Sequence, residues 1–279
     1  MAVEMTPDPV DHRRDAITNL MFELIPLRSA DEAIAALPPA STVSVTCSPT
    51  KGIGATRDLT DRVRNAGHHA VPHLAARMVE SRAQLQAVAR WLRSEGITSV
   101  FVVGGDAEEA AGPYAEGIAL LDDLLSADSG TRSVGVPSYP DGHPLIPAAA
   151  VDAALLAKQE LLDDAGVDGW TSTQMCFDPD RIVDWAARVR AADGLHLPIH
   201  LGLPGVVERA KLLSMGMRLG VGTSLRYLRK NRRAVSRLLA RSDYDPDDLL
   251  LPLAPDLGRL GVTAIHCFTF NQVEATARW

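Results

Sequence analysis

The sequence predicts an α/β fold: a single (β/α)8 barrel that uses the whole chain, residues 1–279. Eight short apolar runs, rich in β-branched residues, alternate with helical patterns along the chain. The length of 279 residues is close to the roughly 250 that one such barrel needs. No linker-like change in composition divides the chain, so we expect one domain, with residues 1–17 as a loose N-terminal tail.

The eight predicted strands follow one another at intervals that leave room for a helix between them. In chain order they are NLMFELIP near Met21, TVSVTCS near Val45, HAVPHLAA near His73, SVFVVGGD at 99–106, SVGVPSYP near Val136, GWTSTQMCF near Gln174, LPIHLGL near His200 and AIHCFTF near Phe268. A doubly wound open sheet is the alternative, and it usually has a Gly-x-Gly-x-x-Gly turn after its first strand. Here the first strand leads into ELIPLRSADEA, which contains no glycine.

Three of the intervening helices have clear boundaries. The segment SRAQLQAVARWLRSEG has Ser81 as N-cap, Gly96 as C-cap and an apolar stripe formed by Leu85, Val88, Ala89 and Leu92. FDPDRIVDWAARVRAADG has Asp178 as cap, Pro179 at the first helical position and Gly194 beyond the end. PAAAVDAALLAKQELLDDAG is the third.

Composition excludes several classes of protein. The formal net charge of -7 argues against nucleic acid as a partner, because nucleic acid requires a basic surface. No apolar run approaches the roughly 20 residues of a membrane span, and the polar start has no signal-peptide pattern. The three cysteines, Cys47, Cys176 and Cys267, have neither disulfide-framework nor metal-site spacing. We expect buried thiols in a cytoplasmic protein without a metal.

The active site of such a barrel forms at the C-terminal ends of its strands. Polar residues fall at or just beyond these ends on six of the predicted strands: Glu23, Thr46, His73, Asp106, Tyr139 with His143, and Gln174. The barrel would gather these side chains at one mouth. We therefore expect Asp106 to face the same cavity as Glu23.

Glu23 lies between apolar residues on both faces of the first strand, since Met21 and Ile25 share its face and Phe22 and Leu24 form the other. Desolvation raises the pKa of a carboxyl group and suits it to act as a general acid near neutrality. The alternative is a structural glutamate paired with an arginine.

The other polar residues each have a structural alternative. A lone histidine such as His73 or His143 is more often structural than catalytic, and Gln174 could bond to backbone or read the edge of a heterocycle. After the seventh strand, Gly220 and Gly222 lead into a basic segment, residues 226–241, that fits either a phosphate site or a solvated helix face.

Seven short motifs occur in one order across nearly the whole chain: FELIP, VSVT, PHL, GGD, YPDGHP, TQMCFD and FTFNQVEAT. They resemble motifs of methylenetetrahydrofolate reductases, barrel enzymes of one-carbon metabolism and methionine biosynthesis. The family versions include FEFFP, HL, RGD, YPEVHP, TQFFFD and YTLNRAEM. The resemblance implies that Glu23 is the proton donor, that Asp106 contacts the pterin and that Gln174 is a substrate-binding amide.

The resemblance also implies a full set of site residues and a reaction. Catalytic roles fall on Glu23 and Asp106. Substrate contacts fall on Thr46, Asp106, Tyr139 and Gln174. Cofactor contacts fall on Thr46, His73, Gly104, Gly105, His143 and Gln174. The reaction is reduction of 5,10-methylenetetrahydrofolate to 5-methyltetrahydrofolate, with NADH or NADPH as hydride donor.

The sequence departs from the family at the flavin contacts. The arginine of RGD is Gly104, the tyrosine after VSVT is Cys47, and the small residue two positions further on is Pro49. The family's polar run on the helix after strand five appears here as Asp152, Leu155, Lys158 and Gln159, and the arginine of the closing motif as Gln272. We therefore expect direct hydride transfer without FAD. The alternatives are a conventional FAD-dependent reductase and a non-catalytic folate- or nucleotide-binding barrel.

Overall fold

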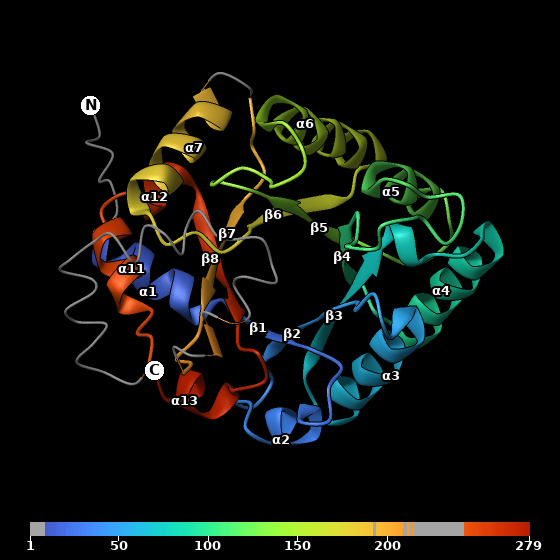
Figure 1. Cartoon of the computed structure of the whole chain (residues 1–279), viewed down its shortest axis with the longest axis horizontal. Coiled ribbons are helices and arrows are strands. Elements are labelled where there is room, and N and C mark those ends of the chain that lie inside the picture. Colours follow the sequence, from blue (N-terminus) through green and yellow to red (C-terminus); the bar gives the residue numbers. More distant parts are fainter. Residues whose placement is uncertain (1–8, 192–193, 209–210, 213, 215–242) are drawn as a thin grey trace, which may run out of the picture.

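The computed structural model describes residues 9–191, 194–208, 211–212, 214 and 243–279 of the chain. Eight parallel strands close into a barrel in the order β1 to β8, with β8 pairing back to β1 (Figure 1). The strands are β1 (Leu20–Leu24), β2 (Thr42–Val45), β3 (His69–Ala75), β4 (Ser99–Val103), β5 (Ser133–Ser138), β6 (Asp168–Thr173), β7 (Ile199–Pro204) and β8 (Val262–Phe268). The predicted (β/α)8 barrel is confirmed.

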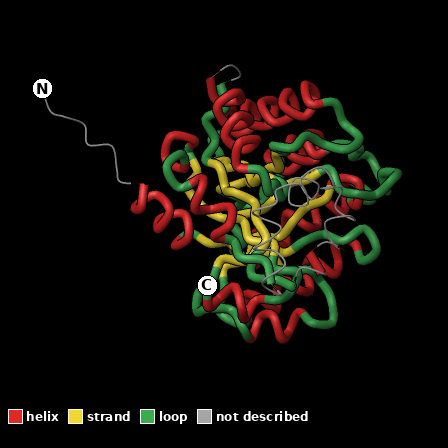
Figure 2. The backbone as a smooth tube through the Cα atoms, turned by 60° about the vertical axis from the view of Figure 1, so that its left-hand side comes forward, coloured by secondary structure: helices red, strands yellow, loops and turns green. Residues whose placement is uncertain are grey.

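Helices surround the strands on the outside, as the views in Figures 1 and 2 both show. They are α1 (Pro9–Thr18), α2 (Ala30–Ala35), α3 (Gly52–Asn65), the 3-10 turn η1 (Ala76–Met78), α4 (Arg82–Glu95), α5 (Gly117–Leu125), α6 (Ala148–Ala165), α7 (Pro179–Ala191), α11 (Asp247–Leu253), α12 (Leu257–Leu260) and α13 (Val273–Arg278). None of the helices within the described ranges has the length and apolar character that a membrane span requires.

The predicted helix boundaries agree with the local hydrogen bonding. The Ser81 hydroxyl accepts a hydrogen bond from the Gln84 amide at 3.2 Å, and Gly96 ends α4 with a φ of 66°. At the start of α7, the Asp178 carboxylate accepts from the Asp180 amide at 3.2 Å. These caps satisfy backbone groups that have no partner within the helix.

The N-terminal segment differs from the loose tail expected over residues 1–17. Residues 9–18 form α1, which packs against β8 and α12. Ala16 is fully buried, and the Arg13 guanidinium lies 2.7 Å from the Asp247 carboxylate of α11. Tertiary packing therefore orders a helix that its own weak apolar pattern did not predict.

The barrel interior is closed by a small apolar floor formed by Met21, Val71, Phe101 and Trp170. Gly135 on β5 makes room for the two rings, since a Cβ at this position would lie 2.3 Å from the Phe101 ring and 2.4 Å from the Trp170 ring. Apolar side chains on the opposite face of the strands, such as Val100, Val102 and Leu201, form the main core against the helices. The polar residues of the interior lie above this floor, toward the carboxyl ends of the strands.

Candidate active site

A layer of polar side chains lies directly above the apolar floor, and we call it the inner polar layer: Glu23, Ser44, His73, Ser172 and His266. Strand alternation produces it, because Glu23 is two residues beyond Met21, and Ser172 is two residues beyond Trp170. All five side chains belong to residues that are at least nine-tenths buried. The layer therefore holds its charges and hydrogen bonds in a nearly dry interior.

Three members of the layer form a continuous hydrogen-bonded chain. The Glu23 Oε2 atom lies 3.1 Å from Nε2 of His266, and Nδ1 of the same ring lies 3.0 Å from the Ser172 hydroxyl. Within the described residues no hydrogen bond reaches Oε1 of Glu23. The carboxylate is thus paired with a histidine from the last strand, where the alternative structural reading of the sequence expected an arginine.

The His266 ring is held between other rings. It stacks on Phe268 with centroids 5.1 Å apart and 14° between the planes. It also meets Phe101 edge-on at 5.7 Å and His73 edge-on at 6.2 Å. These contacts restrict both the position and the tilt of the imidazole.

Two further histidines of the interior are neutral. The Nε2 atom of His73 lies 2.5 Å from the Ser44 hydroxyl. Burial, with a smaller electrostatic contribution from His266, lowers the pKa of His73 to about 3. His200 stacks on Trp170 at 5.4 Å, and the same two causes lower its pKa to about 3.

A second group of predicted residues gathers in the loops after β4 and β5. Asp106 is exposed, while the Tyr139 and His143 rings meet edge-on at 5.1 Å. Burial, and then the negative charge of Asp106, raises the pKa of Tyr139 to about 12. Burial lowers the pKa of His143, and Asp106 opposes this shift. In the described part of the chain no hydrogen bond or ion pair joins Asp106 to Glu23.

Arg77 anchors the loop that carries Asp106. Its guanidinium donates hydrogen bonds to three carbonyls of that loop, those of Ala107, Glu108 and Ala115, at 2.9 to 3.1 Å. Its own amide donates to the Gly104 carbonyl at 3.0 Å. The sequence offered no signal for this role, because the loop and the arginine are about 30 residues apart.

The two glycines before Asp106 differ in what their backbone allows. Gly105 has a φ of +92°, and a Cβ there would lie 3.1 Å from Cβ of Ala75, so glycine is required for this turn. At Gly104 no atom lies within 4 Å of where a Cβ would stand, among the residues that the structure describes. Open space therefore adjoins Gly104.

Thr46 and Gln174 lie just past the ends of β2 and β6. The Thr46 hydroxyl is buried and finds no hydrogen-bond partner among the described residues. The side-chain oxygen Oε1 of Gln174 accepts a hydrogen bond from the adjacent Met175 amide at 2.8 Å, which leaves the side-chain NH2 group for another acceptor. Both side chains thus retain hydrogen-bonding capacity toward a ligand.

Glu23, His73 and His266 are also the residues that could hold a metal ion. Their ligand atoms lie within 4.8 Å of one another, and one carboxylate with two imidazoles is a common donor set for divalent transition metals. In the structure each of these three side chains has a protein partner: Glu23 and His266 in the chain with Ser172, and His73 in the pair with Ser44. We therefore interpret the group as a hydrogen-bonded network.

The predicted departures from the flavin contacts fall on residues with structural partners. Leu155 is part of the main core, and the Gln159 amide bonds to the His196 amide and the Gly194 carbonyl at 2.8 and 3.2 Å. The Asp152 carboxylate pairs with Arg188 at 2.6 Å. Burial lowers the pKa of Lys158.

Other predicted features lie at the closing turn or outside the description. The side-chain oxygen of Gln272 accepts a hydrogen bond from the Glu208 amide at 3.3 Å. Gly220, Gly222 and the basic segment 226–241 lie outside the described residues. None of the three cysteines forms a disulfide bond within the described residues, and Cys176 and Cys267 are buried whereas Cys47 is half-buried.

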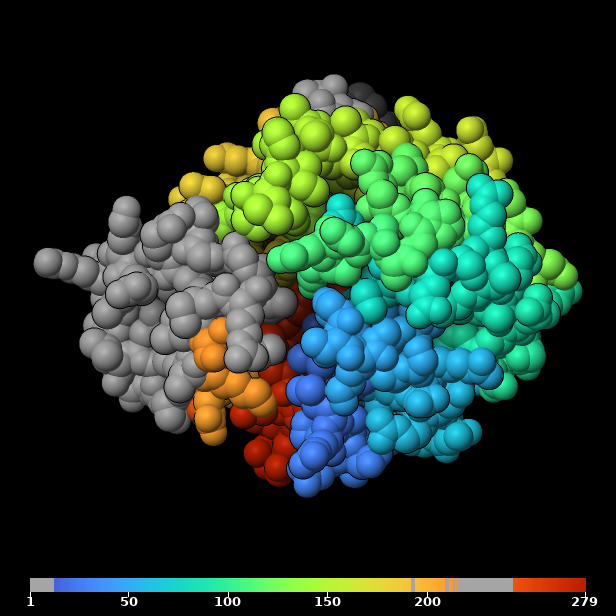
Figure 3. All heavy atoms as spheres, turned by 45° about the vertical axis from the view of Figure 1, so that its right-hand side comes forward, coloured from blue at the N-terminus to red at the C-terminus, as the bar shows by residue number. Residues whose placement is uncertain are grey.

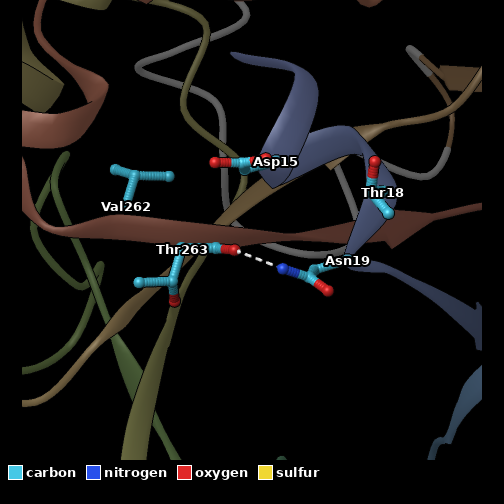
Figure 4. A pocket seen from close by; sticks show the side chains of 5 residues that line it. All are labelled: Asp15, Thr18, Asn19, Val262 and Thr263. Carbon is cyan, nitrogen blue, oxygen red and sulfur yellow. Dashed lines mark hydrogen bonds between the residues drawn. The ribbon is translucent and has the colours of Figure 1, made fainter. Parts of the chain in front are cut away.

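The molecule has a surface depression and a separate cavity. In Figure 3 the red C-terminal segment is visible in a depression between the blue and green segments. A cavity of about 320 Å³ lies elsewhere, between α1 and the start of β8, lined by Asp15, Thr18, Asn19, Val262 and Thr263 (Figure 4). It is at the amino end of β8, whereas Glu23 pairs with Phe268 at the carboxyl end, so this cavity is separate from the inner polar layer.

Similarity to solved structures extends to the fold. A family 18 chitinase from Crocus vernus matches 92% of this chain and 95% of its own, with a TM-score of 0.50 and 10% sequence identity. Because the identity is so low, this likeness supports the barrel alone.

Similarity in sequence is more specific. "Methylenetetrahydrofolate reductase 2" of Saccharomyces cerevisiae is 40% identical over 82 residues, which are 29% of this chain and 13% of the yeast protein. The matched region is thus a small part of that relative. The sequence model of one family, described as methylenetetrahydrofolate reductase, matches residues 32–216, which are most of the barrel from α2 to beyond β7. The chain belongs to the methylenetetrahydrofolate reductase family.

Proposed function

We propose that this protein reduces 5,10-methylenetetrahydrofolate to 5-methyltetrahydrofolate with NADH or NADPH, and that the hydride passes directly to the folate without FAD. Family membership supports folate reduction. The observation that carries the proposal is Glu23, a buried carboxyl group with one oxygen held by His266 and the other without a hydrogen bond in the described part of the chain.

The chemistry requires one proton and one hydride. The carboxyl group of Glu23 gives its proton to N10, the bond between N10 and the methylene carbon breaks, and a 5-iminium cation forms. Hydride from the reduced nicotinamide then reaches the methylene carbon and completes the methyl group. An acid that protonates N10 must be buried beside the folate, and the inner polar layer supplies such an acid.

The outer group fits the charge that develops during ring opening. Asp106 is an exposed carboxylate at the mouth, anchored through its loop by Arg77. We assign it to stabilising the cationic pterin. The Thr46 hydroxyl has no hydrogen-bond partner among the described residues, and it and the NH2 group of Gln174 are suited to the polar edge of the pterin. Tyr139 and His143 are suited to the rim of the site.

The residues at the family's flavin positions do not fit FAD. Leu155 offers no hydrogen bond, and the Gln159 amide is already used on the backbone of residues 194–197. Gly104 has no side chain where the family has an arginine. Phosphate groups require charged or donor side chains, so we derive no step through a flavin.

Open space at Gly104 supports a site for a flat ring. A nicotinamide lying over this backbone would face the folate with its hydride-bearing carbon. Replacing Gly104 by Leu should raise the KM for the nucleotide, whereas Gly104→Ala adds only a methyl group and should have a small effect. Equal KM values for both variants and the wild type would remove Gly104 from the nucleotide site.

The deciding experiment is steady-state kinetics of the purified protein without added flavin, read together with its absorption spectrum. We expect no flavin absorption, NADH or NADPH oxidation that depends on methylenetetrahydrofolate, and intersecting lines typical of a ternary complex. Glu23→Gln serves as the inactive control. Parallel lines with bound flavin would favour the FAD-dependent alternative, and folate binding without turnover would favour a binding protein.

A further inference from the structure

We infer that His266 is a positioning residue for Glu23, and that Ser172 sets its tautomer, so that only the Oε1 atom of the acid can carry the transferable proton. The inference deepens the proposed function and rests on it. It is drawn from the chain of Ser172, His266 and Glu23, with contacts of 3.0 and 3.1 Å.

The donor and acceptor roles follow from the chemistry of the two ends. A serine hydroxyl can donate to Nδ1, which leaves the ring proton on Nε2, and the Nε2–H group then donates to Oε2 of Glu23. The Nε2–H group can donate to Oε2 in both states of Glu23: in the protonated acid, whose proton is on Oε1, and in the anion. The opposite arrangement would place the proton on Oε2, between two protein side chains and away from a substrate.

The fold holds this geometry through the closure of the barrel. His266 is paired with Met21 across the β8–β1 junction, and Glu23 is paired with Phe268, so the histidine and the acid are diagonal neighbours on adjacent strands. The His266 side chain is 2% exposed and that of Glu23 is 11% exposed. Stacking on Phe268 keeps the ring in place.

The proton balance gives His266 a role in the transition state. As the Oε1 proton moves to N10, negative charge forms on the Glu23 carboxylate, and the Nε2–H contact becomes a charge-assisted hydrogen bond. A donor aimed in advance at developing charge in a dry site lowers the barrier. The other groups near the acid do not take this role: Nε2 of His73 is paired with Ser44, and among the described residues no hydrogen bond joins His73 or His200 to Glu23. Burial keeps Cys267 a thiol by raising its pKa.

The first test compares substitutions at His266. His266→Phe keeps a stacked ring and removes the N–H donor, and we expect kcat to fall by about 10- to 100-fold, the scale of a charge-assisted hydrogen bond, with a smaller change in KM. The alkaline limb of the kcat/KM profile should move to higher pH, because the ionised carboxylate loses its donor. His266→Gln retains an N–H group and should restore much of the activity.

The matched control is an exposed pair with the same geometry. His196 Nε2 lies 3.1 Å from the Asp163 carboxylate on the surface, and His196→Phe should leave kcat and the pH profile unchanged. Wild-type kcat and an unmoved pH profile in His266→Phe would overturn the inference while leaving the proposed function in place.

A double-mutant cycle tests the tautomer argument. Ser172→Ala should lower kcat on its own, and should have little further effect in the His266→Phe background, because the serine acts only through the ring. Thermal unfolding checks that each variant is folded. If His266→Phe fails to fold, the effect of Ser172→Ala on kcat still tests the inference, because this substitution removes only one oxygen atom. Additive effects of the two substitutions would contradict the inference.

Nitrogen-15 NMR of the imidazoles shows which nitrogen of His266 carries the proton, without any reductase assay. The signals absent from His266→Gln identify the ring, and we expect the Nε2–H tautomer in the wild type. Ser172→Ala should release this preference, and Glu23→Gln should shift the Nε2 signal. An Nδ1–H tautomer, or no response to either substitution, would disprove the inference even if the protein proves not to be a reductase.

Discussion

Two histidine–carboxylate pairs in this molecule have the same geometry and opposite surroundings. His266 and Glu23 approach to 3.1 Å inside the barrel, and His196 and Asp163 approach to 3.1 Å on the surface. The side chains of the first pair are 2% and 11% exposed, and those of the second are 60% and 51% exposed. Distance alone therefore says nothing of the energy or the role of such a pair.

The difference comes from solvent. Around the exposed pair, water screens the charges and competes for the hydrogen bond, so such pairs contribute little. Around the buried pair, either group left alone has no water to replace its partner. A buried pair is thus costly to break, and it can control a proton because few other groups are available to take it.

The largest expected difference is in stability. His266→Ala should lower the free energy of unfolding by roughly 3–5 kcal/mol, because it leaves the Glu23 carboxylate buried without a donor. His196→Ala should change it by no more than about 1 kcal/mol. Urea unfolding of both variants, followed by circular dichroism, measures the difference. Similar losses for the two variants would mean that solvent does not distinguish the pairs.

The next expected difference is in catalysis. Glu23→Gln should keep folate binding and lower turnover by about 10²-fold or more, the usual scale for losing a general acid. Asp163→Asn makes the same chemical change in the exposed pair and should leave turnover as it is. Steady-state kinetics with methylenetetrahydrofolate compare the two, and near-normal turnover of Glu23→Gln would end its assignment as the acid.

The last expected difference, and the smallest per unit of pH, is between a buried and an exposed histidine in how stability depends on pH. The pKa of His73 is about 3 in the folded protein and about 6.5 in an unfolded chain, so the unfolded state binds more protons between these values. The free energy of unfolding should therefore be highest above pH 6.5 as far as this histidine is concerned. It should fall as the pH is lowered toward 3, by up to about 1.4 kcal/mol per pH unit.

Removing that histidine should flatten the curve. Urea unfolding of His73→Phe between pH 6.5 and 4 should give a smaller slope than the wild type, since the buried ring no longer takes up a proton on unfolding. His196→Gln, with its histidine on the surface, should retain the wild-type slope. If the free energy of unfolding depended on pH more steeply in His73→Phe than in the wild type, the low pKa assigned to His73 would be wrong.

Much of the fold was predictable because it depends on local patterns. The eight strands, their order and the caps at Ser81 and Asp178 follow from periodicity and capping chemistry, and the structure confirms them. Residues 9–17 were expected as a tail because α1 has a weak apolar pattern, and only its packing on β8 and α12 orders it. Local patterns cannot report such contacts.

The inward placement of Glu23 was predictable from the sequence, whereas its hydrogen-bond partner was not. Alternation along β1 places Glu23 inside the barrel, but its partner comes from β8, 243 positions along the chain. A signal was present, since His266 and Phe268 lie on one face of AIHCFTF. Which side chain faces which depends on the register of the last strand against the first, and no local pattern contains that register.

The sequence by itself determined the alternation of strands and helices, the placement of Glu23 on an inward face and the family motifs from FELIP to FTFNQVEAT. Tertiary structure alone decided that His266 holds Glu23, that Leu155 packs in the core and that Gln159 bonds to the backbone of residues 194–197. The physical reason is that periodicity is written within a few residues, whereas burial and partner choice arise only when the barrel closes and excludes water.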